Sequence, residues 1–347
     1  MKRKRVLDAD RDHLVHVLPT LEVSGCYAFA TTMASELYKD YAHTLLFENP
    51  IGELDPSLVY QAQASGMMVH NVDRITPEVI DRGNYTGAIL YNVRGHPGIG
   101  KVVPTIYYSY GIYDMAPTED VIVPCSEYAV THSRYEEDPI GKGPEAEYVI
   151  PPMVRTRMMR RIKAPPHPFV IGILTSGAYD KYPCGMVIKL LSKLPGDAVI
   201  LLNVLPKYLH PGMPTAIAER EKRYPGRLKE APVMPLVTLR YLALSDVVIV
   251  ASRGSHREPY GRLAVEAMAM GKPVICERSG IYPEMLEHGV NALLYDTPHD
   301  ALDHVARIRR DVTVTAQLAA NAQMWASWQD TAVHIGKLKR VLRMIGA

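Results

Sequence analysis

The chain has 347 residues, of which 47% are apolar and 22% charged, so it is long enough for two ordinary domains and has a globular composition. It contains no apolar run of 18 residues, which argues against a membrane span, and the basic start at 2–5 is followed by acidic residues, which argues against a signal peptide. Four scattered cysteines without a Cys-x-x-Cys pair predict neither a zinc site nor a disulfide framework, and a reducing cytoplasm is the default expectation.

The net charge of +2 is unevenly divided along the chain. Residues 1–154 hold 12 Lys and Arg against 21 Asp and Glu, whereas residues 155–347 hold 27 against 16. A basic second half fits an anionic ligand such as a nucleotide diphosphate, and an acidic first half argues against broad docking on DNA or anionic lipid through that half. The alternative is that both surfaces are merely solvated.

The first half alternates between short apolar runs and helical spacing. A strand is expected at Leu14–Pro19, and a helix from Ser24 to about Lys39. Further strands are expected at Thr44–Phe47, Met67–His70, Ala88–Asn92, Thr105–Tyr108, Asp120–Pro124 and Glu147–Ile150. Strands that alternate with helices predict a parallel, doubly wound sheet. Pro151 and Pro152 end this half, and the basic segment Arg155–Lys163 and a proline-rich linker follow.

The same alternation restarts after the linker. Strands are expected at Phe169–Leu174, Ala198–Val204, Arg227–Lys229, Val247–Ala251, Val274–Cys276 and Ala292–Tyr295, with helices at Met186–Lys193, Val237–Ala243 and Pro259–Met270. Two such halves predict two Rossmann-like parallel-sheet domains that face a cleft, with ligands beyond the carboxyl ends of the strands. The tail Trp325–Leu342 has an amphipathic helical pattern with basic residues at its end.

Two carboxylates flank the start of the predicted helix at Pro259–Met270. Pro259 disfavours a helical conformation for Glu258 and suits a first helical turn, so Glu258 is expected in a loop at the helix N-terminus. Glu266 lies about two turns inside the helix. Free backbone N–H groups at a helix N-terminus suit a diphosphate, and two acids at this spacing suit an elongated, hydroxyl-rich ligand. The plain alternative is an N-terminal glutamate that complements the helix dipole and an ordinary exposed one.

The surrounding residues resemble the donor-site motif of glycosyltransferase family 4, the retaining GT-B enzymes. Their pattern Glu-x7-Glu followed by Ala-Met-Ala-x-Gly-x-Pro-Val is met by Glu258, Glu266, residues 267–269, Gly271 and residues 273–274. The segments Ser279–Glu284 and Gly289–Leu294 continue the likeness, which is strong across about 236–296. The resemblance implies a GT-B fold with an acceptor domain at 1–154, a donor domain at 155–324, and a C-terminal helix at 325–347 that crosses back to the first domain.

The resemblance also implies roles for individual residues. Glu266 is expected to bind the donor ribose hydroxyls, and Glu258 to lie near the donor sugar, with backbone N–H groups of Tyr260, Gly261 and Arg262 facing sugar or phosphate. The family supplies an Arg and a Lys for the leaving diphosphate. The Arg position is Ile173 here, and Lys181 is the candidate for the Lys, with an exposed loop lysine as its alternative.

Two further positions are candidates in the first half. Ser24 and Gly25 stand where the family has two glycines near phosphate and acceptor, and Ser24 keeps the capacity to cap a helix. His96 follows a predicted strand and is a candidate to hydrogen-bond a sugar, against a structural role. No metal site is expected, and no cofactor other than the nucleotide-diphosphate sugar as co-substrate.

The resemblance implies a hexosyltransferase-type enzyme that moves a sugar to an acceptor hydroxyl on a surface glycan, a lipid-linked glycan or a small molecule, with retained configuration and without a protein general base. Arg155–Lys163 is a candidate contact with a membrane surface or nucleic acid, in a cytoplasmic protein that is peripheral at the membrane. Three alternatives stay open: a glycosyltransferase that modifies a hydroxylated DNA base, a non-catalytic nucleotide-sugar-binding protein, and a sugar epimerase.

Overall fold

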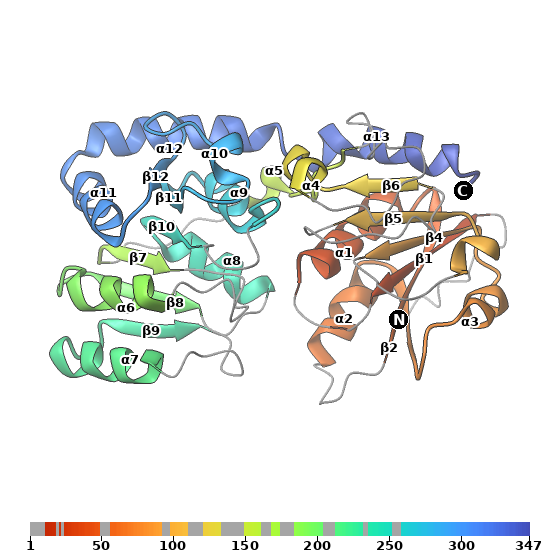
Figure 1. Ribbon diagram of the computed structural model, residues 1–347, viewed down its shortest axis with the longest axis horizontal. Helices are drawn as coiled ribbons and strands as arrows, with labels where there is room; N and C mark the ends of the chain where they lie inside the picture. Colours follow the sequence, from red (N-terminus) through yellow and green to blue (C-terminus); the bar gives the residue numbers. More distant parts are fainter. Residues whose placement is uncertain are drawn as a thin grey trace, which may run out of the picture. The chain divides into compact units, whose positions relative to one another are not determined.

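The computed structural model describes residues 11–18, 21, 24–48, 56–91, 98–109, 121–132, 149–160, 168–173, 184–203, 212–231, 235–251 and 258–347. The chain divides into two compact units (Figure 1). Unit 1 comprises Met1–Met153 and His334–Ala347, and unit 2 comprises Val154–Val333. Both units are built from a parallel sheet and helices.

The sheet of unit 1 has the strand order β3-β2-β1-β4-β5-β6, and every neighbouring pair is parallel. Its strands are β1 (Asp12–Leu18), β2 (Tyr41–Glu48), β3 (Met67–Val72), β4 (Gly87–Tyr91), β5 (Thr105–Ser109) and β6 (Val121–Pro124). The helices are α1 (Gly25–Leu37), α2 (Pro56–Ala64), α3 (Pro77–Arg82), α4 (Glu127–His132) and the short 3-10 helix η1 (Ile99–Lys101). The fold therefore follows from short, almost continuously buried strands that alternate with helices.

Two apolar layers enclose this sheet because successive strand residues point to opposite faces. Val15 and Val17 of β1 pack with Ile80 of α3 and Ile99 of η1 on one face. On the other face, Phe29 of α1 stacks on Tyr108 of β5, with ring centroids 4.2 Å apart. The side chains His16 and His43 are buried on that second face, with His16 Nε2 2.9 Å from His43 Nδ1 and His16 Nδ1 2.8 Å from Tyr91 Oη.

The sheet of unit 2 has the order β12-β11-β10-β7-β8-β9 and is also parallel at every neighbouring pair. Its strands are β7 (Val170–Ile173), β8 (Val199–Asn203), β9 (Leu228–Ala231), β10 (Val247–Val250), β11 (Val274–Glu277) and β12 (Leu293–Tyr295). The helices are α5 (Thr156–Met159), α6 (Cys184–Lys193), α7 (Gly212–Arg223), α8 (Pro235–Leu244), α9 (Arg262–Ala269), α10 (Tyr282–Met285), α11 (Pro298–Arg310) and α12 (Val312–Ser327). A last helix, α13 (Thr331–Met344), begins in unit 2 and continues into unit 1.

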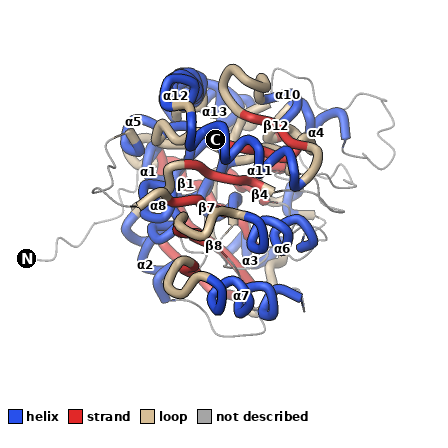
Figure 2. Tube along the Cα trace, turned by 90° about the vertical axis from the view of Figure 1, so that its left-hand side faces the viewer, coloured by secondary structure: helices blue, strands red, loops and turns tan. Residues whose placement is uncertain are grey.

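One large core lies on a single face of this second sheet. It joins Ile171 and Ile173 of β7 to buried residues of α6, α7 and α11, and Figure 2 shows α6 and α11 on the same side of β7 and β8. The opposite face is covered by α8 and α9, which contact β7 and β10 respectively. In both sheets the chain order of the strands reverses direction at the first strand, between β1 and β4 and between β7 and β10. Ligands of doubly wound sheets bind at this switch point, beyond the carboxyl ends of the strands.

The predicted fold class of two doubly wound parallel sheets is confirmed, and three local predictions need correction. Of the expected strand Glu147–Ile150, residues 147–148 lie outside the described residues, and Val149 and Ile150 are irregular, since the following Pro151 and Pro152 have no N–H group to extend a ladder. The helix expected from Pro259 begins at Arg262. The tail from Trp325 is not one continuous helix, since α12 ends at Ser327 and α13 begins at Thr331.

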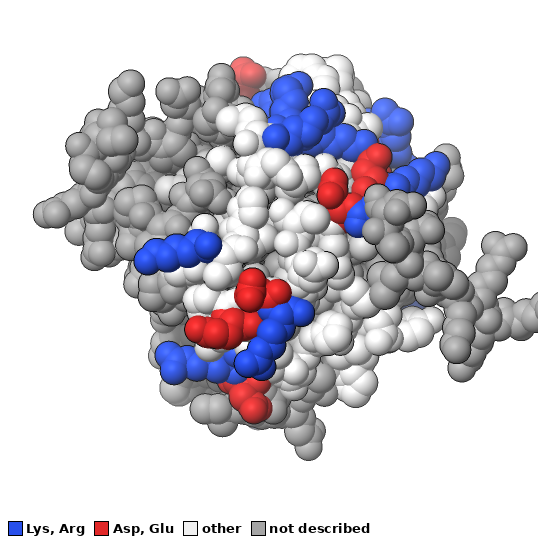
Figure 3. Space-filling view, turned by 90° about the vertical axis from the view of Figure 1, so that its right-hand side faces the viewer, with Lys and Arg blue, Asp and Glu red and all other residues white. Residues whose placement is uncertain are grey.

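The helix α13 changes the charge balance of the units. It brings Lys337, Lys339, Arg340 and Arg343 to unit 1 without an acidic residue, so the formal charge becomes −5 for unit 1 and +7 for unit 2. Figure 3 shows Lys and Arg side chains gathered at the top of one face of unit 1. Lys339 of α13 pairs with Asp40 at 2.8 Å. Across the described ranges, no helix combines the length and apolar character that crossing a membrane requires.

Candidate functional site

Glu258 is held in a tight loop beyond the carboxyl end of β10. Its side chain is buried, and its Oε1 accepts a hydrogen bond of 3.2 Å from the Gly261 N–H. Its carbonyl oxygen accepts a bond of 2.9 Å from the Ile281 N–H. Gly280 has φ +59°, and a Cβ there would lie 2.5 Å from the Glu258 carbonyl oxygen. Glycine at 280 therefore lets the segment after β11 pack directly on the Glu258 backbone.

Gly261 sets the point at which α9 begins. It is the N-cap residue with φ +74° and ψ 41°, a left-handed conformation that glycine adopts without steric cost. A Cβ at this position would lie 2.5 Å from Cε1 of the buried Tyr282 ring. Pro259 therefore does not occupy the first helical turn as expected. The left-handed residue ends the loop, and helical geometry starts only at Arg262.

Glu266 lies one turn into α9 and is buried. Its Oε1 accepts a bond of 2.7 Å from Nε of Arg262, four residues earlier on the helix. The small-residue run of the motif explains why the helix is enclosed, since Ala267, Met268 and Ala269 are completely or almost completely buried. A helix that is apolar nearly all round is a core helix, and α9 packs between α12, α8, β10 and β11.

The end of α9 is also defined by the motif. Gly271 follows the helix with φ +69°, and Gln323 of α12 donates to the Ala269 carbonyl at 3.1 Å. Lys272 Nζ donates to the Ala243 carbonyl near the end of α8 at 2.7 Å, and burial lowers the pKa of this ammonium group. These contacts fix the C-terminal end of the helix that carries Glu266.

The predicted donor-binding residue Tyr260 is buried, and its hydroxyl donates to Oε1 of Gln329 at 3.1 Å. The structure thus brings Glu258, Tyr260, Gly261, Arg262 and Glu266 together in one stretch of unit 2. Sequence reasoning assigned no contact to Gly280 and Tyr282, although both lie in the quoted segment after β11. Arg262 was expected to act through its backbone N–H and as a source of positive charge for the diphosphate, and the i, i+4 spacing to Glu266 was the signal for the ion pair that its side chain makes.

The remaining predicted residues lie elsewhere. Ser24 is the N-cap of α1, where its Oγ accepts a bond of 3.2 Å from the Tyr27 N–H, and Gly25 is the first residue of that helix. Ile173 ends β7 inside the core of unit 2. Lys181 and His96 lie outside the described residues, as do residues 161–163 of the basic segment.

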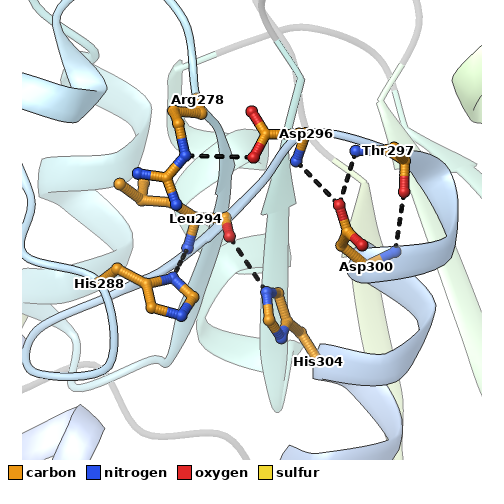
Figure 4. Close-up of polar contacts among 7 residues, drawn as sticks. All are labelled: Arg278, His288, Leu294, Asp296, Thr297, Asp300 and His304. Atoms are coloured by element: carbon orange, nitrogen blue, oxygen red, sulfur yellow. Dashed lines mark hydrogen bonds and ion pairs between the residues drawn. The ribbon is translucent and has the colours of Figure 1, made fainter.

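A second polar cluster surrounds β12 (Figure 4). His288 Nδ1 accepts from the Leu294 N–H at 2.9 Å, and His304 Nε2 lies 3.1 Å from the Leu294 carbonyl oxygen. Burial and the neighbouring His304 lower the pKa of His288. Arg278 pairs with Asp296 at 3.2 Å, and Thr297 and Asp300 form a capping box on α11. The contacts within this cluster serve the edge strand and the helix start. Among the described residues, no group of three or more His, Cys, Asp or Glu side chains is arranged to hold a metal ion.

Comparison with known proteins gives one family match. The model of the family described as glycosyl transferases group 1 matches residues 237–325, a range that contains both glutamates and α9. A search among curated protein sequences found no match.

Several solved structures share the fold of the whole chain. The structure of Anabaena HepE in complex with UDP and glucose is 18% identical, with a TM-score of 0.74 over 96% of this chain and 100% of that protein. A glycosyltransferase from Rickettsia africae is 13% identical, with a TM-score of 0.74 over 97% and 99%. Sucrose-phosphate synthase from Thermosynechococcus elongatus is 12% identical, with a TM-score of 0.66 over 96% and 100%. The expected GT-B fold is confirmed by these matches.

Proposed function

We propose that this protein is a glycosyltransferase that moves a sugar from a nucleotide-diphosphate sugar to an acceptor hydroxyl, because its residues 237–325 match the model of the glycosyl transferases group 1 family. The observation that carries the proposal is the pair of buried carboxylates, Glu258 and Glu266, beyond the end of β10 at the switch point of a parallel sheet. Buried carboxylates are costly unless they serve a partner, and vicinal sugar hydroxyls are donors that suit them. HepE, which shares the fold, binds UDP and glucose.

The proposed roles combine the family resemblance with the contacts that Glu258 and Glu266 make in unit 2. Glu266 accepts hydrogen bonds from the ribose hydroxyls, each worth roughly 1.5–3 kcal/mol as a charge-assisted bond. Glu258, braced by the Gly261 N–H, faces the donor sugar. Lys181 supplies positive charge to the leaving diphosphate. Ser24 and Gly25 are assigned to donor binding and His96 to catalysis, and the acceptor is expected to bind mainly on unit 1.

The proposed reaction retains the configuration of the transferred sugar. The bond between the anomeric carbon and the diphosphate oxygen breaks, and the acceptor oxygen bonds to the same carbon from the same face. The acceptor proton passes to the departing diphosphate oxygen, so no protein base is needed. Fixed dipoles and cations stabilise the charge that develops on the diphosphate.

A binding experiment tests the donor site. We expect Glu266→Ala to weaken UDP binding at least about 10-fold in calorimetry, since the loss of even one charge-assisted bond of roughly 1.5 kcal/mol corresponds to that factor. Glu284→Ala is the matched control, because Glu284 is an exposed acid on α10. A Glu266→Ala protein that melts at the same temperature as the parent and binds UDP as tightly would remove the assignment.

A product assay separates the proposed transferase from a nucleotide-sugar-binding protein and from an epimerase. A transferase releases nucleoside diphosphate from its donor and yields a glycosylated acceptor or, with water, free sugar. A binding protein retains the donor unchanged, and an epimerase changes the sugar without an acceptor. Release of UDP or GDP from a panel of nucleotide sugars is the expected result.

The basic segment Arg155–Lys163 is proposed to meet an anionic membrane surface. Arg160 Nη2 donates to the Gln323 carbonyl of α12 at 3.2 Å, which places α5 beside the end of that helix. Met158 on α5 and Trp328 after α12 are about equally exposed, at 61% and 60%. Exposed apolar side chains among arginines fit an anionic bilayer interface.

Vesicle sedimentation tests this surface. The protein is expected to pellet with phosphatidylglycerol-containing vesicles, and Trp328→Ser with Met158→Ser to reduce pelleting. The membrane proposal would be contradicted if the protein pelleted equally with neutral phosphatidylcholine vesicles. It would also be contradicted if the protein bound duplex DNA and the two substitutions left that binding unchanged.

A further inference from the structure

Arg262 and Glu266 form an ion pair that differs from an ordinary surface pair. Nε of Arg262 donates to Oε1 of Glu266 at 2.7 Å, and the two side chains are only 16% and 12% exposed. For comparison, the surface pair of Arg278 with Asp296 has a contact of 3.2 Å and side chains that are 42% and 59% exposed. A partly buried pair has lower dielectric screening and a more fixed geometry than an exposed one.

The pair is well placed to orient one carboxylate oxygen. Arg262 and Glu266 are the only charged residues of α9, whose remaining residues are apolar and mostly buried. Gly261, in its left-handed conformation, fixes the backbone from which the Arg262 side chain extends. The bond from Arg262 uses Oε1, and within the described part of the chain no hydrogen bond is made to Oε2 of Glu266. The carboxylate is thus held at one oxygen, with the other oriented but uncommitted.

We propose that Arg262 is a positioning residue that turns Glu266 so that Oε2 meets the ribose diol of the donor, and thereby makes the site selective for ribonucleotides. The inference rests on the proposed function, because it takes Glu266 as the ribose ligand. A guanidinium is planar and always charged, so a carboxylate paired with it keeps one orientation better than a carboxylate that is bonded only to water. A site built to bond a hydroxyl discriminates against the analogue that lacks it, since the buried acceptor is then left unpaired.

The test measures discrimination rather than affinity alone. Calorimetry compares UDP, GDP and ADP with their 2′-deoxy counterparts on the parent chain, Arg262→Leu, Arg262→Lys and the matched control Arg278→Leu. We expect the parent to prefer the best ribonucleotide by at least about 10-fold over its deoxy form. Arg262→Leu should lose most of this preference, with affinity for the deoxy form changed less than about twofold. Arg262→Lys should restore part of it, and Arg278→Leu should match the parent.

The possible failures are distinguishable. An Arg262→Leu protein that loses affinity for both nucleotides by the same factor would show that Arg262 acts on the phosphates or merely supports the fold, and would overturn the inference. Discrimination that persists in Arg262→Leu would also overturn it. If the parent chain binds none of the ribonucleotides, the proposed function itself fails and the inference fails with it. Melting temperatures identify a variant that does not fold, and Arg262→Lys then provides the comparison.

Discussion

Replacing Gly280 by alanine should displace the loop that carries Glu258. The glycine has φ +59°, and its added Cβ would lie 2.5 Å from the Glu258 carbonyl oxygen and 2.8 Å from the Glu258 nitrogen. Both neighbours are main-chain atoms, so no side-chain rotation can relieve the overlap. Ordinary contact begins at 3.4 Å, and the Glu258 backbone would therefore need to retreat by almost 1 Å.

The expected cost has two parts. A left-handed conformation costs an alanine roughly 1–2 kcal/mol, and overpacking adds about 1–3 kcal/mol. Gly289 provides a matched control, because it has φ +81° and its added Cβ would meet nothing within 4 Å. Gly289→Ala should then cost about 1–2 kcal/mol and Gly280→Ala about 2–5 kcal/mol. For a unit of this size these costs correspond to about 2–8 °C and about 4–20 °C in melting temperature.

The assay is differential scanning calorimetry of both variants, together with binding of UDP and of a UDP-sugar that the parent chain uses. Because the displaced loop faces the donor sugar in the proposed site, Gly280→Ala should weaken the UDP-sugar more than UDP. A misplacement near 1 Å is enough to reduce transfer by about 100-fold. Equal melting temperatures for Gly280→Ala and Gly289→Ala would refute the argument from the close contact. A normal transfer rate in Gly280→Ala would show that the contact at Gly280 does not position the donor site.

Two further predictions concern stability. Arg220 is 3% exposed and donates to three backbone carbonyls at and just beyond the end of α6, at 2.7–3.0 Å. Arg220→Met should therefore lower the unfolding free energy by about 2–4 kcal/mol in denaturant titrations, and Arg220→Lys should lower it by less. An unchanged midpoint of the Arg220→Met titration would contradict this prediction. Burial lowers the pKa of His43 from 6.5 to about 4, so the unfolded chain binds the proton more readily between these values. The stability that neutral His43 contributes is present above pH 6.5 and declines as the pH falls toward 4, by at most about 1.4 kcal/mol per pH unit. His43→Asn should flatten the dependence of unfolding free energy on pH in that window, and an unchanged slope would assign the acid sensitivity to other groups.

The two sheets could be predicted from the sequence because their strands are short apolar runs rich in β-branched residues. The observed β10 at Val247–Val250 differs by one residue from the predicted Val247–Ala251. The segment Glu147–Ile150 has similar composition, but the prolines after it cannot donate to a neighbouring strand. Composition identifies a segment that tolerates extended geometry, whereas a ladder also requires a partner and free N–H groups.

The start of α9 shows a different limit. Pro259 is a common signal for a helix start, yet the helix begins only after Gly261, which has a left-handed conformation. The φ angle of a glycine depends on the residues that pack against it. Here the buried ring of Tyr282, 21 residues further along the chain, occupies the space that a Cβ would need. The sequence contains both residues, but their contact depends on how β11 and its following turn return to β10. Long-range contacts of this kind are not encoded in a local pattern.

The two glutamates are held by different means, and this explains why only part of the site could be foreseen. Glu258 is placed by main-chain contacts, through the N–H groups of Gly261 and Ile281 and the bare Cα of Gly280. Glu266 is placed by a side chain, Arg262, on its own helix. Gly280 lies in the segment that continues the family likeness, whereas Gly261 and Arg262 both stand at positions that the motif leaves free. Substitutions at Gly280 should therefore shift the loop as a whole, while substitutions at Arg262 should leave the backbone in place and change only the orientation of one carboxylate.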